Sequence, residues 1–444
     1  MSAWLDLIGG VVERGRAMVD LRRAAARGDA EAVVELCERL LGAIGEASGT
    51  AVADEALGLY RALEPPERRA VLLALAERFG PDLDRLDAAA RAYADAPGAA
   101  SASALHLASE PRRQELMRRL NRAPGGTAAL VAMREDVLDA LPGMPDLAPL
   151  DDDFRHLFGS WFNRGFLTMQ RIDWRTPAVV LERIIRYEAV HEIGDWEDLR
   201  RRIDPPDRRL YAFFHPALPD EPLIFVEVAL TTDMPAAIGA VLAADREPLD
   251  PARAKVATFY SISNCQRGLK GISFGSFLIK QVAADLALEC PALESFVTLS
   301  PVPGLRDWAR AEGAAMLGEA DASVLAALGP EPSPEAIEAT RSVLEPLARA
   351  YLLEAKNARG RPLDPVARFH LGNGARLERL NWLADPSPKG LAQSFGAMVN
   401  YRYVLGEIER NHEAYANEAR IVTGPPFRRG PGRRRVRPPA TAPA

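Results

Sequence analysis

The sequence predicts an α+β protein, with a helical N-terminal domain followed by a domain built on a mixed, mainly antiparallel sheet. From Trp4 to about Phe158, apolar residues recur at helical spacing among alanine, arginine, leucine and glutamate, which are good helix formers. After Trp161 the pattern changes to short strand-like runs separated by helical stretches. We therefore expect a helical domain over residues 1–158 and an α+β domain over residues 159–423.

Within the second domain, the strand candidates are short runs rich in aromatic and aliphatic residues. They look antiparallel and surround a central helix, which is typical of an α+β sheet. The helical patterns between and after them are richer in charged residues or in alanine. The expected strands are 209–214, 223–229, 257–263 and 295–299, and the expected helices are 196–202, 234–243, the segment after Ser276, and segments between Trp308 and Leu353.

The two ends of the chain carry little chemical signal. The N-terminal helices show apolar faces, such as Leu36 with Leu40, but no repeat of fixed period and no cluster of reactive side chains. The segment 424–444 holds six arginines among prolines and glycines, with no acidic residue. It is expected to be a solvated, disordered tail, and binding of an anion or a partner is the alternative.

Composition excludes several classes of function. The 444-residue chain has a formal net charge of -6, which provides no general affinity for nucleic acid or for an anionic membrane. No apolar run is long enough to span a bilayer, and the N-terminus lacks the features of a signal peptide. Three cysteines (Cys37, Cys265 and Cys290) make no disulfide framework, so the expected location is the reducing cytoplasm.

A glycine-rich turn from Gln266 to Ser276 lies between the predicted strand 257–263 and a helix that carries Leu278 and Val282 on one face. Such a turn directs free backbone N–H groups and the positive end of the helix dipole toward an anion, so it is suited to hold a diphosphate. It lacks the Gly-Lys-Ser/Thr ending of a P-loop and the glycine spacing of a dinucleotide fingerprint. A plain connection between two elements is the alternative reading.

Ser300 and His370 are the candidate reactive residues. Ser300 follows the predicted strand 295–299 and precedes a proline, where a simple turn residue is the alternative. His370 is expected in a loop, beside Gly372-Asn373-Gly374, whose glycines permit close approach to a ligand and whose Asn373 offers a donor and an acceptor. No pair of histidines has the spacing of metal ligands, and there is no His/Cys cluster, so no metal site is expected.

The turn is similar to the pyrophosphate loop of GNAT-type acyltransferases. In that register, a lysine stands where those enzymes have Gln or Arg, and a serine replaces their first glycine. The residues concerned are Lys270, Gly271, Ile272, Ser273, Phe274, Gly275 and the closing Ser276.

From about Gly159 to Tyr403 the chain resembles the malonyl-CoA decarboxylase family, because a whole series of segments follows the order of that family. The segments are Glu188-Ala-Val-His-Glu, Glu221-Pro-Leu, Val228-Ala-Leu-Thr231, Phe259-Tyr-Ser-Ile-Ser263, Gln266-Arg-Gly-Leu-Lys-Gly271 through Lys280, Leu299-Ser-Pro-Val-Pro-Gly304, Phe369-His-Leu-Gly-Asn-Gly-Ala375, Asn381-Trp, Ala384-Asp385 and Asn400-Tyr-Arg-Tyr403.

The resemblance implies a GNAT-like catalytic domain that binds CoA thioesters, preceded by a helical domain used for oligomerisation. It implies that Ser300 and His370 are catalytic and that the loop from Lys270 to Ser276 binds CoA. We also expect Ser300, His370 and, from the turn that contains it, Asn373 to contact the substrate. A homo-oligomer, a tetramer built as a dimer of dimers, is expected. The organelle signals of animal members do not transfer to this chain.

The implied reaction converts malonyl-CoA to acetyl-CoA and CO2 through a thioester enolate. Because the thioester itself accepts the electron pair, neither a metal nor biotin is required. A positioned acid or base contributes about 10²–10⁴-fold to such a step, and a histidine paired with a serine hydroxyl could transfer the proton. A CoA-dependent acyltransferase of the GNAT type and a non-catalytic scaffold are the competing hypotheses.

Overall fold

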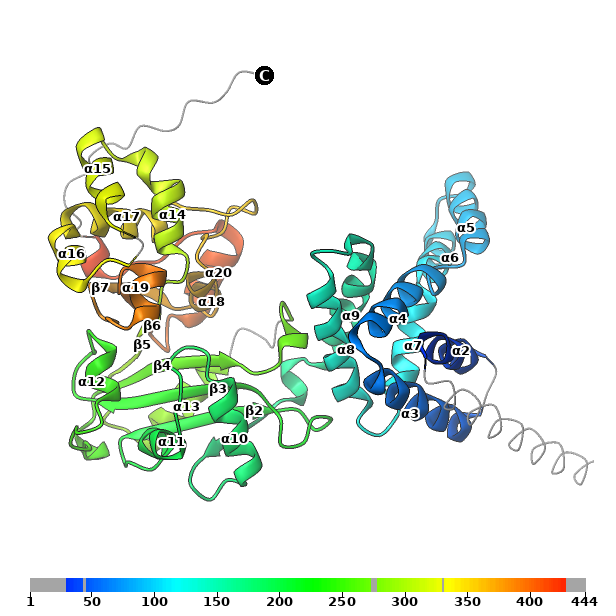
Figure 1. The fold of residues 1–444 in the computed structure, drawn as a ribbon, viewed down its shortest axis with the longest axis horizontal. Coiled ribbons are helices and arrows are strands. Elements are labelled where there is room, and N and C mark those ends of the chain that lie inside the picture. Colours follow the sequence, from blue (N-terminus) through cyan, green and yellow to red (C-terminus); the bar gives the residue numbers. More distant parts are fainter. Residues whose placement is uncertain (1–28, 43–44, 273–277, 330, 429–444) are drawn as a thin grey trace, which may run out of the picture. The chain divides into compact units, whose positions relative to one another are not determined.

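A computed structural model describes residues 29–42, 45–272, 278–329 and 331–428 (Figure 1). The chain divides into two compact units. The first holds the chain through Thr168 together with Phe214–Glu221 and the described part of Gln266–Phe274, and the second holds the remainder. The predicted domain boundary after residue 158 lies inside helix α9, before the division after Thr168.

The first unit is helical, as predicted. Its helices begin at recognisable caps: for example, the Asp29 carboxylate accepts the Ala32 N–H at 2.8 Å, and Pro65 occupies the first turn of its helix. The described helices are α2 (Ala30–Leu41), α3 (Glu46–Ala62), α4 (Pro65–Arg78), α5 (Leu83–Asp95), α6 (Ala99–Ser109), α7 (Arg112–Leu120), α8 (Gly126–Ala140) and α9 (Ala148–Trp161).

Burial is uneven among these helices. Helices α2, α3 and α8 bury continuous apolar faces against one another and against their neighbours, whereas α5 buries no residue and α6 buries only Ala108. These two helices form an antiparallel-looking pair whose apolar residues are exposed; the exposed fractions are 73% for Leu83 and 55% for Leu107. The pair therefore gains little stability from the core of its own unit.

The beginning of the glycine-rich turn packs on helix α8 within the first unit. A Cβ at Gly268 would lie 2.1 Å from the Val131 carbonyl oxygen, so only glycine fits at this contact. The Gly268 carbonyl accepts a hydrogen bond from Arg134 at 2.6 Å, and its N–H donates to the Glu135 carboxylate at 3.2 Å. This part of the turn is held by helix α8.

The second unit is built on one mixed, mainly antiparallel sheet, in agreement with the predicted α+β class (Figure 1). The strand order is β1-β2-β3-β4-β5-β8-β6, and β7 pairs with β8. The four predicted strands are confirmed as β2 (Arg208–Phe214), β3 (Pro222–Thr231), β4 (Val256–Asn264) and β5 (Ser295–Thr298). Four further strands were not predicted: β1 (Thr168–Ile172), β6 (Ser300–Pro301), β7 (Arg376–Asn381) and β8 (Met398–Tyr403).

Strands β4 and β5 run parallel and are paired over four residue pairs, after which they separate. Their pairing extends from Val256 opposite Ser295 to Phe259 opposite Thr298. Strand β4 then continues beside β3 to Asn264. The segment that follows β5 instead pairs with β8, where Ser300 lies opposite Val399. The two strands therefore diverge after Phe259 and Thr298.

Helices surround this sheet, and the predicted helices at 196–202 and after Ser276 are confirmed. The predicted helix at 234–243 is shorter than expected, since only Ile238–Leu242 is helical. The helices are α10 (Ala178–Tyr187), α11 (Trp196–Ile203), α12 (Ile238–Leu242), α13 (Leu278–Glu289), α14 (Leu305–Ala311), α15 (Glu319–Ala327), α16 (Pro334–Ala339), α17 (Arg341–Leu353), α18 (Pro365–Gly372), α19 (Pro388–Ser394), α20 (Ile408–Glu418) and α21 (Pro425–Arg428).

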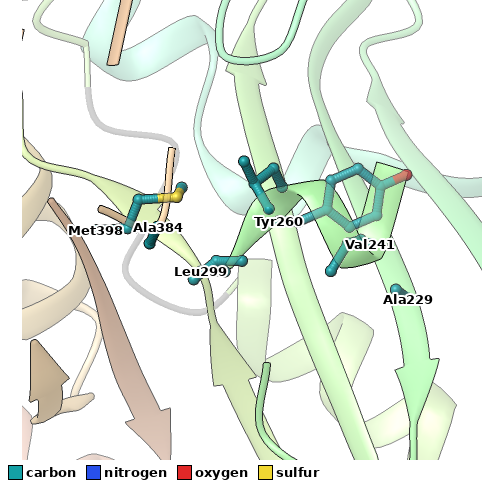
Figure 2. Close-up of a cluster of buried hydrophobic side chains, with 7 residues drawn as sticks. Ala229, Val241, Tyr260, Leu299, Ala384 and Met398 are labelled. Atoms are coloured by element: carbon teal, nitrogen blue, oxygen red, sulfur yellow. The ribbon is translucent and has the colours of Figure 1, made fainter. Parts of the chain in front are cut away.

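One buried apolar cluster ties α12 to the sheet beside the diverging strands. In Figure 2, Leu299 lies between Met398 and Ala384 on one side and the Tyr260 ring on the other, with Val241 next to that ring. All of these side chains are 5% exposed or less. Because Leu299 immediately precedes Ser300, this packing fixes the backbone that carries the candidate serine.

Two expectations need correction. His370 lies in the last turn of helix α18 and not in a loop. The segment from Gly424 to Arg428 is ordered: the Gly424 N–H donates to Leu377 at 2.8 Å, and the Arg349 guanidinium lies 4.6 Å from the Phe427 ring centre. The disorder predicted from Gly424 is therefore wrong for this stretch, and the rest of the predicted tail lies outside the described residues.

None of the described helices has the length and apolar character needed to cross a bilayer.

Candidate active site

Ser300 and His370 meet in the second unit, although 70 residues separate them in the sequence. The Ser300 Oγ lies 3.0 Å from the His370 Nε2, within hydrogen-bond distance. Both side chains are buried, with exposed fractions of 5% and 3%. The two residues that the sequence singled out thus form a direct pair.

Local features of helix α18 hold His370 in place. The Asp364 carboxylate caps the helix by accepting the Ala367 N–H at 2.6 Å, and Pro365 starts the first turn. After Asn373, Gly374 adopts a left-handed conformation with φ +81°. A Cβ at Gly374 would lie 2.2 Å from the Ile408 carbonyl oxygen, so this glycine permits close contact with helix α20. We had expected it to permit close approach to a ligand instead.

Strand β8 supplies the other contacts of the imidazole. The Tyr403 hydroxyl lies 2.8 Å from His370 Nδ1, and the Tyr401 ring stacks on the imidazole with 4.6 Å between the ring centres and an interplanar angle of 25°. The imidazole therefore has a hydrogen-bond partner at each nitrogen and an aromatic ring on its face. Such contacts fix both the position and the rotation of the ring.

Burial determines the charge state of these groups. Desolvation lowers the pKa of His370 to about 3, and it raises the pKa of Tyr403 well above its ordinary value. Near neutral pH the imidazole is thus neutral and the phenol keeps its proton.

Thr298, the last residue of strand β5, lies on the other side of Ser300. The Ser300 hydroxyl donates to Thr298 Oγ1 at 2.8 Å, and the Tyr401 backbone N–H donates to the same oxygen at 3.1 Å. The Thr298 carbonyl accepts a bond from Asn400 Nδ2 at 2.7 Å. Neutral hydrogen-bonding groups therefore form one continuous row, which runs from Tyr403 through His370 and Ser300 to Thr298.

The Ser300–His370 pair opens onto a pocket of about 240 Å³ within the second unit. One wall is the part of β4 that continues beyond its pairing with β5, and another wall is helix α18. Apolar side chains provide most of the lining, as is usual for pockets that bind organic ligands. The lining residues are Val190, Phe259, Tyr260, Ile262, Asn264, Ser300, Pro301, Pro365, Val366, Phe369 and His370.

A buried carboxylate supports the wall that includes Val190. Glu188 accepts hydrogen bonds from the Ser261 and Ser263 hydroxyls at 2.7 and 3.1 Å, and from the backbone N–H groups of Val190 and His191 at 2.8 and 2.7 Å. This carboxylate therefore ties the segment to strand β4. Within the described ranges, no group of three or more acidic, histidine or cysteine side chains is arranged to bind a metal ion.

The remaining residues predicted to contact the substrate are Asn373 and the loop from Lys270 to Ser276. Asn373 caps helix α18, donates its side-chain amide to the Phe369 carbonyl at 2.7 Å, and is absent from the pocket lining. In the predicted CoA loop, Lys270 is exposed and Gly271 adopts a left-handed φ of +81°, followed by Ile272. Ser273, Phe274, Gly275 and Ser276 lie outside the described residues.

Comparisons with known proteins identify the family. A model of the malonyl-CoA decarboxylase C-terminal domain matches residues 165–434, and a model of the N-terminal domain of the same family matches residues 79–162. The crystal structure of malonyl-CoA decarboxylase from Rhodopseudomonas palustris is 54% identical, with a TM-score of 0.86, and the match covers 90% of this chain and 99% of that chain. The chain belongs to the malonyl-CoA decarboxylase family.

Further relatives agree with this assignment. The crystal structure of malonyl-CoA decarboxylase from Agrobacterium vitis is 51% identical, with a TM-score of 0.82, over 89% of this chain and 98% of that chain. The mitochondrial malonyl-CoA decarboxylase of the goose, Anser anser anser, is 35% identical over 405 residues, which cover 82% of this chain and 79% of that protein. The family predicted from the sequence segments is confirmed, and a carboxy-lyase is favoured over an acyltransferase.

Three residues of the site were missed by sequence reasoning: Thr298, Tyr401 and Tyr403. The two tyrosines lie in the segment Asn400-Tyr-Arg-Tyr403, which had indicated the decarboxylase family without suggesting a role. Thr298 lies two residues before Ser300 and gave no signal of its own. Only the pairing of β8 beside β5 brings these side chains to the serine and the histidine.

Proposed function

We propose that this chain decarboxylates malonyl-CoA to acetyl-CoA and CO2 through a thioester enolate, with Ser300 and His370 handling the proton. The observation that carries the proposal is the buried Ser300–His370 pair, with 3.0 Å between Oγ and Nε2, at a pocket in a member of the malonyl-CoA decarboxylase family. Family membership supports the reaction, and the geometry of the pair supports the roles of the residues.

In the proposed reaction, the bond between the methylene carbon and the carboxylate breaks and CO2 leaves. The electron pair moves into the thioester carbonyl and forms an enolate, which then takes one proton at carbon. The apolar pocket favours the first step, because the charge of the carboxylate is better solvated in water than in a dry cavity, whereas CO2 is neutral. The thioester is itself the electron sink, so the proposal includes neither metal nor biotin.

We assign the proton transfer to the Ser300–His370 pair acting as a relay. Both residues line the pocket, and the neutral imidazole can pass the proton of its N–H group to the serine as the serine hydroxyl protonates the enolate carbon. Tyr403 holds the far nitrogen of the ring. His370 is then left as an imidazolate anion beside the Tyr403 hydroxyl, and it regains one proton from solvent, so that atoms and charge balance over one turnover.

One assay tests the reaction. Purified protein is incubated with malonyl-CoA in D2O without any acyl acceptor, and CO2 and acetyl-CoA are measured. Decarboxylation without an acceptor, with one deuterium in the product methyl group, is the expected result. An acyltransferase would require an amine or thiol acceptor, so product that forms only after an acceptor is added would contradict the proposal.

We further propose that the turn from Lys270 to Ser276 holds the diphosphate of CoA. The left-handed Gly271 and the exposed Lys270 ammonium support this role. Gly275→Asp should weaken CoA-ester binding by about tenfold or more, through steric conflict and repulsion between like charges. Isothermal titration calorimetry with acetyl-CoA measures this, and unchanged affinity in a folded variant would remove the turn from the site.

A homo-oligomer, built as a tetramer of two dimers, is proposed for the full chain. Helices α5 and α6 support it, because they expose Leu83, Tyr93 and Leu107 and bury almost nothing within their own unit. Replacing Leu83 and Leu107 by Gln should shift the protein to a smaller species in multi-angle light scattering. A monomer at all concentrations of the unmodified chain would contradict this proposal. We also propose a cytoplasmic location, since the three cysteines are buried and form no disulfide with one another.

A further inference from the structure

We propose that Thr298 is a positioning residue that sets the direction of the Ser300 hydroxyl and thereby selects which nitrogen of His370 carries the proton. This inference rests on the proposed function of the Ser300–His370 pair. It concerns a residue that does not line the pocket and that acts through Ser300 alone.

Thr298 is held rigidly, as is required of a residue that orients another side chain. Its side chain is fully buried, and its hydroxyl oxygen accepts the Tyr401 N–H at 3.1 Å. Its carbonyl accepts Asn400 Nδ2 at 2.7 Å, and Asn400 is fixed in turn because its side-chain oxygen accepts bonds from Asn381 at 2.7 Å and from Arg379 at 3.1 Å. Strands β7 and β8 thus fix the acceptor for Ser300 from behind.

A count of the protons leads to one arrangement. Ser300 has a single hydroxyl proton, which is donated to Thr298 Oγ1 at 2.8 Å. The 3.0 Å contact between Ser300 and His370 must then use a proton on Nε2. A neutral imidazole carries only one N–H, so Nδ1 has a free lone pair and accepts the Tyr403 hydroxyl at 2.8 Å. Each of these three contacts then has one donor and one acceptor.

In this arrangement all the protons point the same way, from Tyr403 through His370 and Ser300 to Thr298. That direction suits delivery of a proton to substrate: the Ser300 O–H rotates from Thr298 to the enolate carbon, and the His370 N–H replaces the proton that Ser300 gives up. Without Thr298 as an acceptor, Ser300 would donate to Nε2, and the imidazole proton would lie on Nδ1. The pair would then be set to withdraw a proton from Ser300, which is the opposite direction.

Two variants at one position test this. Thr298→Val keeps the shape of the side chain and removes the acceptor, whereas Thr298→Ser keeps the hydroxyl. We expect Thr298→Val to lower kcat by about 10- to 100-fold, less than loss of the acid–base pair itself, with KM changed only a few fold. Thr298→Ser should restore kcat to within a few fold of the unmodified enzyme, which a purely structural role of the methyl group would not do.

The second readout is the tautomer of His370, measured by NMR on the full-length protein labelled with 15N-histidine. His370→Asn identifies the signal by its loss. The proton is expected on Nε2 in the unmodified protein and on Nδ1 in Thr298→Val. A proton on Nδ1 in the unmodified protein overturns the inference even if no Thr298 variant folds, and equal losses of kcat in the Val and Ser variants overturn it as well.

These outcomes separate the inference from the function on which it rests. The tautomer is measured without turnover, so it does not depend on the reaction that the enzyme catalyses. An unmodified protein that fails to decarboxylate malonyl-CoA would contradict the proposed function. The tautomers of that same protein and of Thr298→Val would still support the positioning role or overturn it.

Discussion

Buried polar groups differ in kind between two places in the chain, the interior of the helical unit and the immediate surroundings of Ser300. In the helical unit, two buried arginines are paired with carboxylates: Arg113 pairs with Asp153, and Arg134 pairs with Asp151 at 2.8 Å while also donating to Gly268. Around Ser300 in the sheet unit they are neutral, and they form a row that ends at a pocket.

The difference has a physical reason. A buried ion must be fully paired, because an unpaired charge in a low dielectric costs several kcal/mol, so a saturated pair has no free atom to offer a ligand. Neutral hydroxyl and imidazole groups are less costly to bury, and their protons can change partners. We therefore expect substitutions in the helical unit to change stability without changing chemistry, and substitutions in the row to do the reverse.

The largest expected effect is on turnover. Ser300→Ala and His370→Asn should each lower kcat by about 10²–10⁴-fold, with CoA-ester affinity within a few fold, because their contribution falls in the transition state. The double variant should be little worse than the poorer single variant, since both belong to one relay. Steady-state kinetics and urea unfolding measure the two sides of the comparison.

Ser394→Ala provides a matched control, because Ser394 is also buried and donates its hydroxyl to the Ala397 carbonyl at 2.8 Å, away from the pocket lining. It should keep near-normal kcat. A correctly folded His370→Asn protein with near-normal turnover would refute the assignment of the histidine, even if the decarboxylase activity itself were demonstrated.

The second effect is on stability. Asp153→Ala leaves the Arg113 guanidinium buried without its partner and also removes the acceptor of Gln114. The free energy of unfolding should fall by about 3–5 kcal/mol, as is typical when one member of a buried pair is deleted. The kcat of the folded protein should stay the same.

The neighbouring Asp152 offers the control for this experiment, because its side chain is 76% exposed and it pairs only loosely with Arg155 at 3.6 Å. Asp152→Ala should change the free energy of unfolding by about 0.5 kcal/mol or less. Equal effects of the two substitutions in urea titrations would mean that burial of the Arg113 pair does not control the stability of this unit.

The smallest expected effect is a pH dependence that comes from His370. Its pKa is lowered from 6.5 to about 3 by burial, so the unfolded chain binds more protons than the folded one between these values. The stability contributed by the neutral imidazole is therefore complete above pH 6.5 and is lost as the pH falls toward 3. The unmodified protein should lose stability relative to His370→Asn when the pH is lowered from about 8 to about 5.

Urea titrations of the two proteins at both pH values measure this difference, and kcat should show no inflection from His370 over the same range. If the difference in stability between them did not change with pH, the imidazole would have an ordinary pKa in the folded state. The row around Ser300 would then resemble the charged pairs of the helical unit more than the structure indicates.

Local pattern determined a large part of this protein. The helical N-terminal unit, four strands of the sheet and helices α11 and α13 follow from apolar spacing and propensity, which act over a few residues. The serine and the histidine also came from the sequence, through segments such as Leu299-Ser-Pro-Val-Pro-Gly304 that resemble a known family. Strands β7 and β8 did not, because charged residues such as Arg376, Arg379 and Arg402 interrupt their alternation.

The tertiary structure decided what these residues can do. Tyr403 lies 33 positions from His370, and Tyr401 lies 103 positions from Thr298, so no local pattern could pair them. The neutral state of the imidazole likewise depends on burial by strands and helices that are distant in the chain. Desolvation and hydrogen-bond direction are properties of the packed environment around a side chain, and that environment exists only once β8 has paired with β5 beside helix α18.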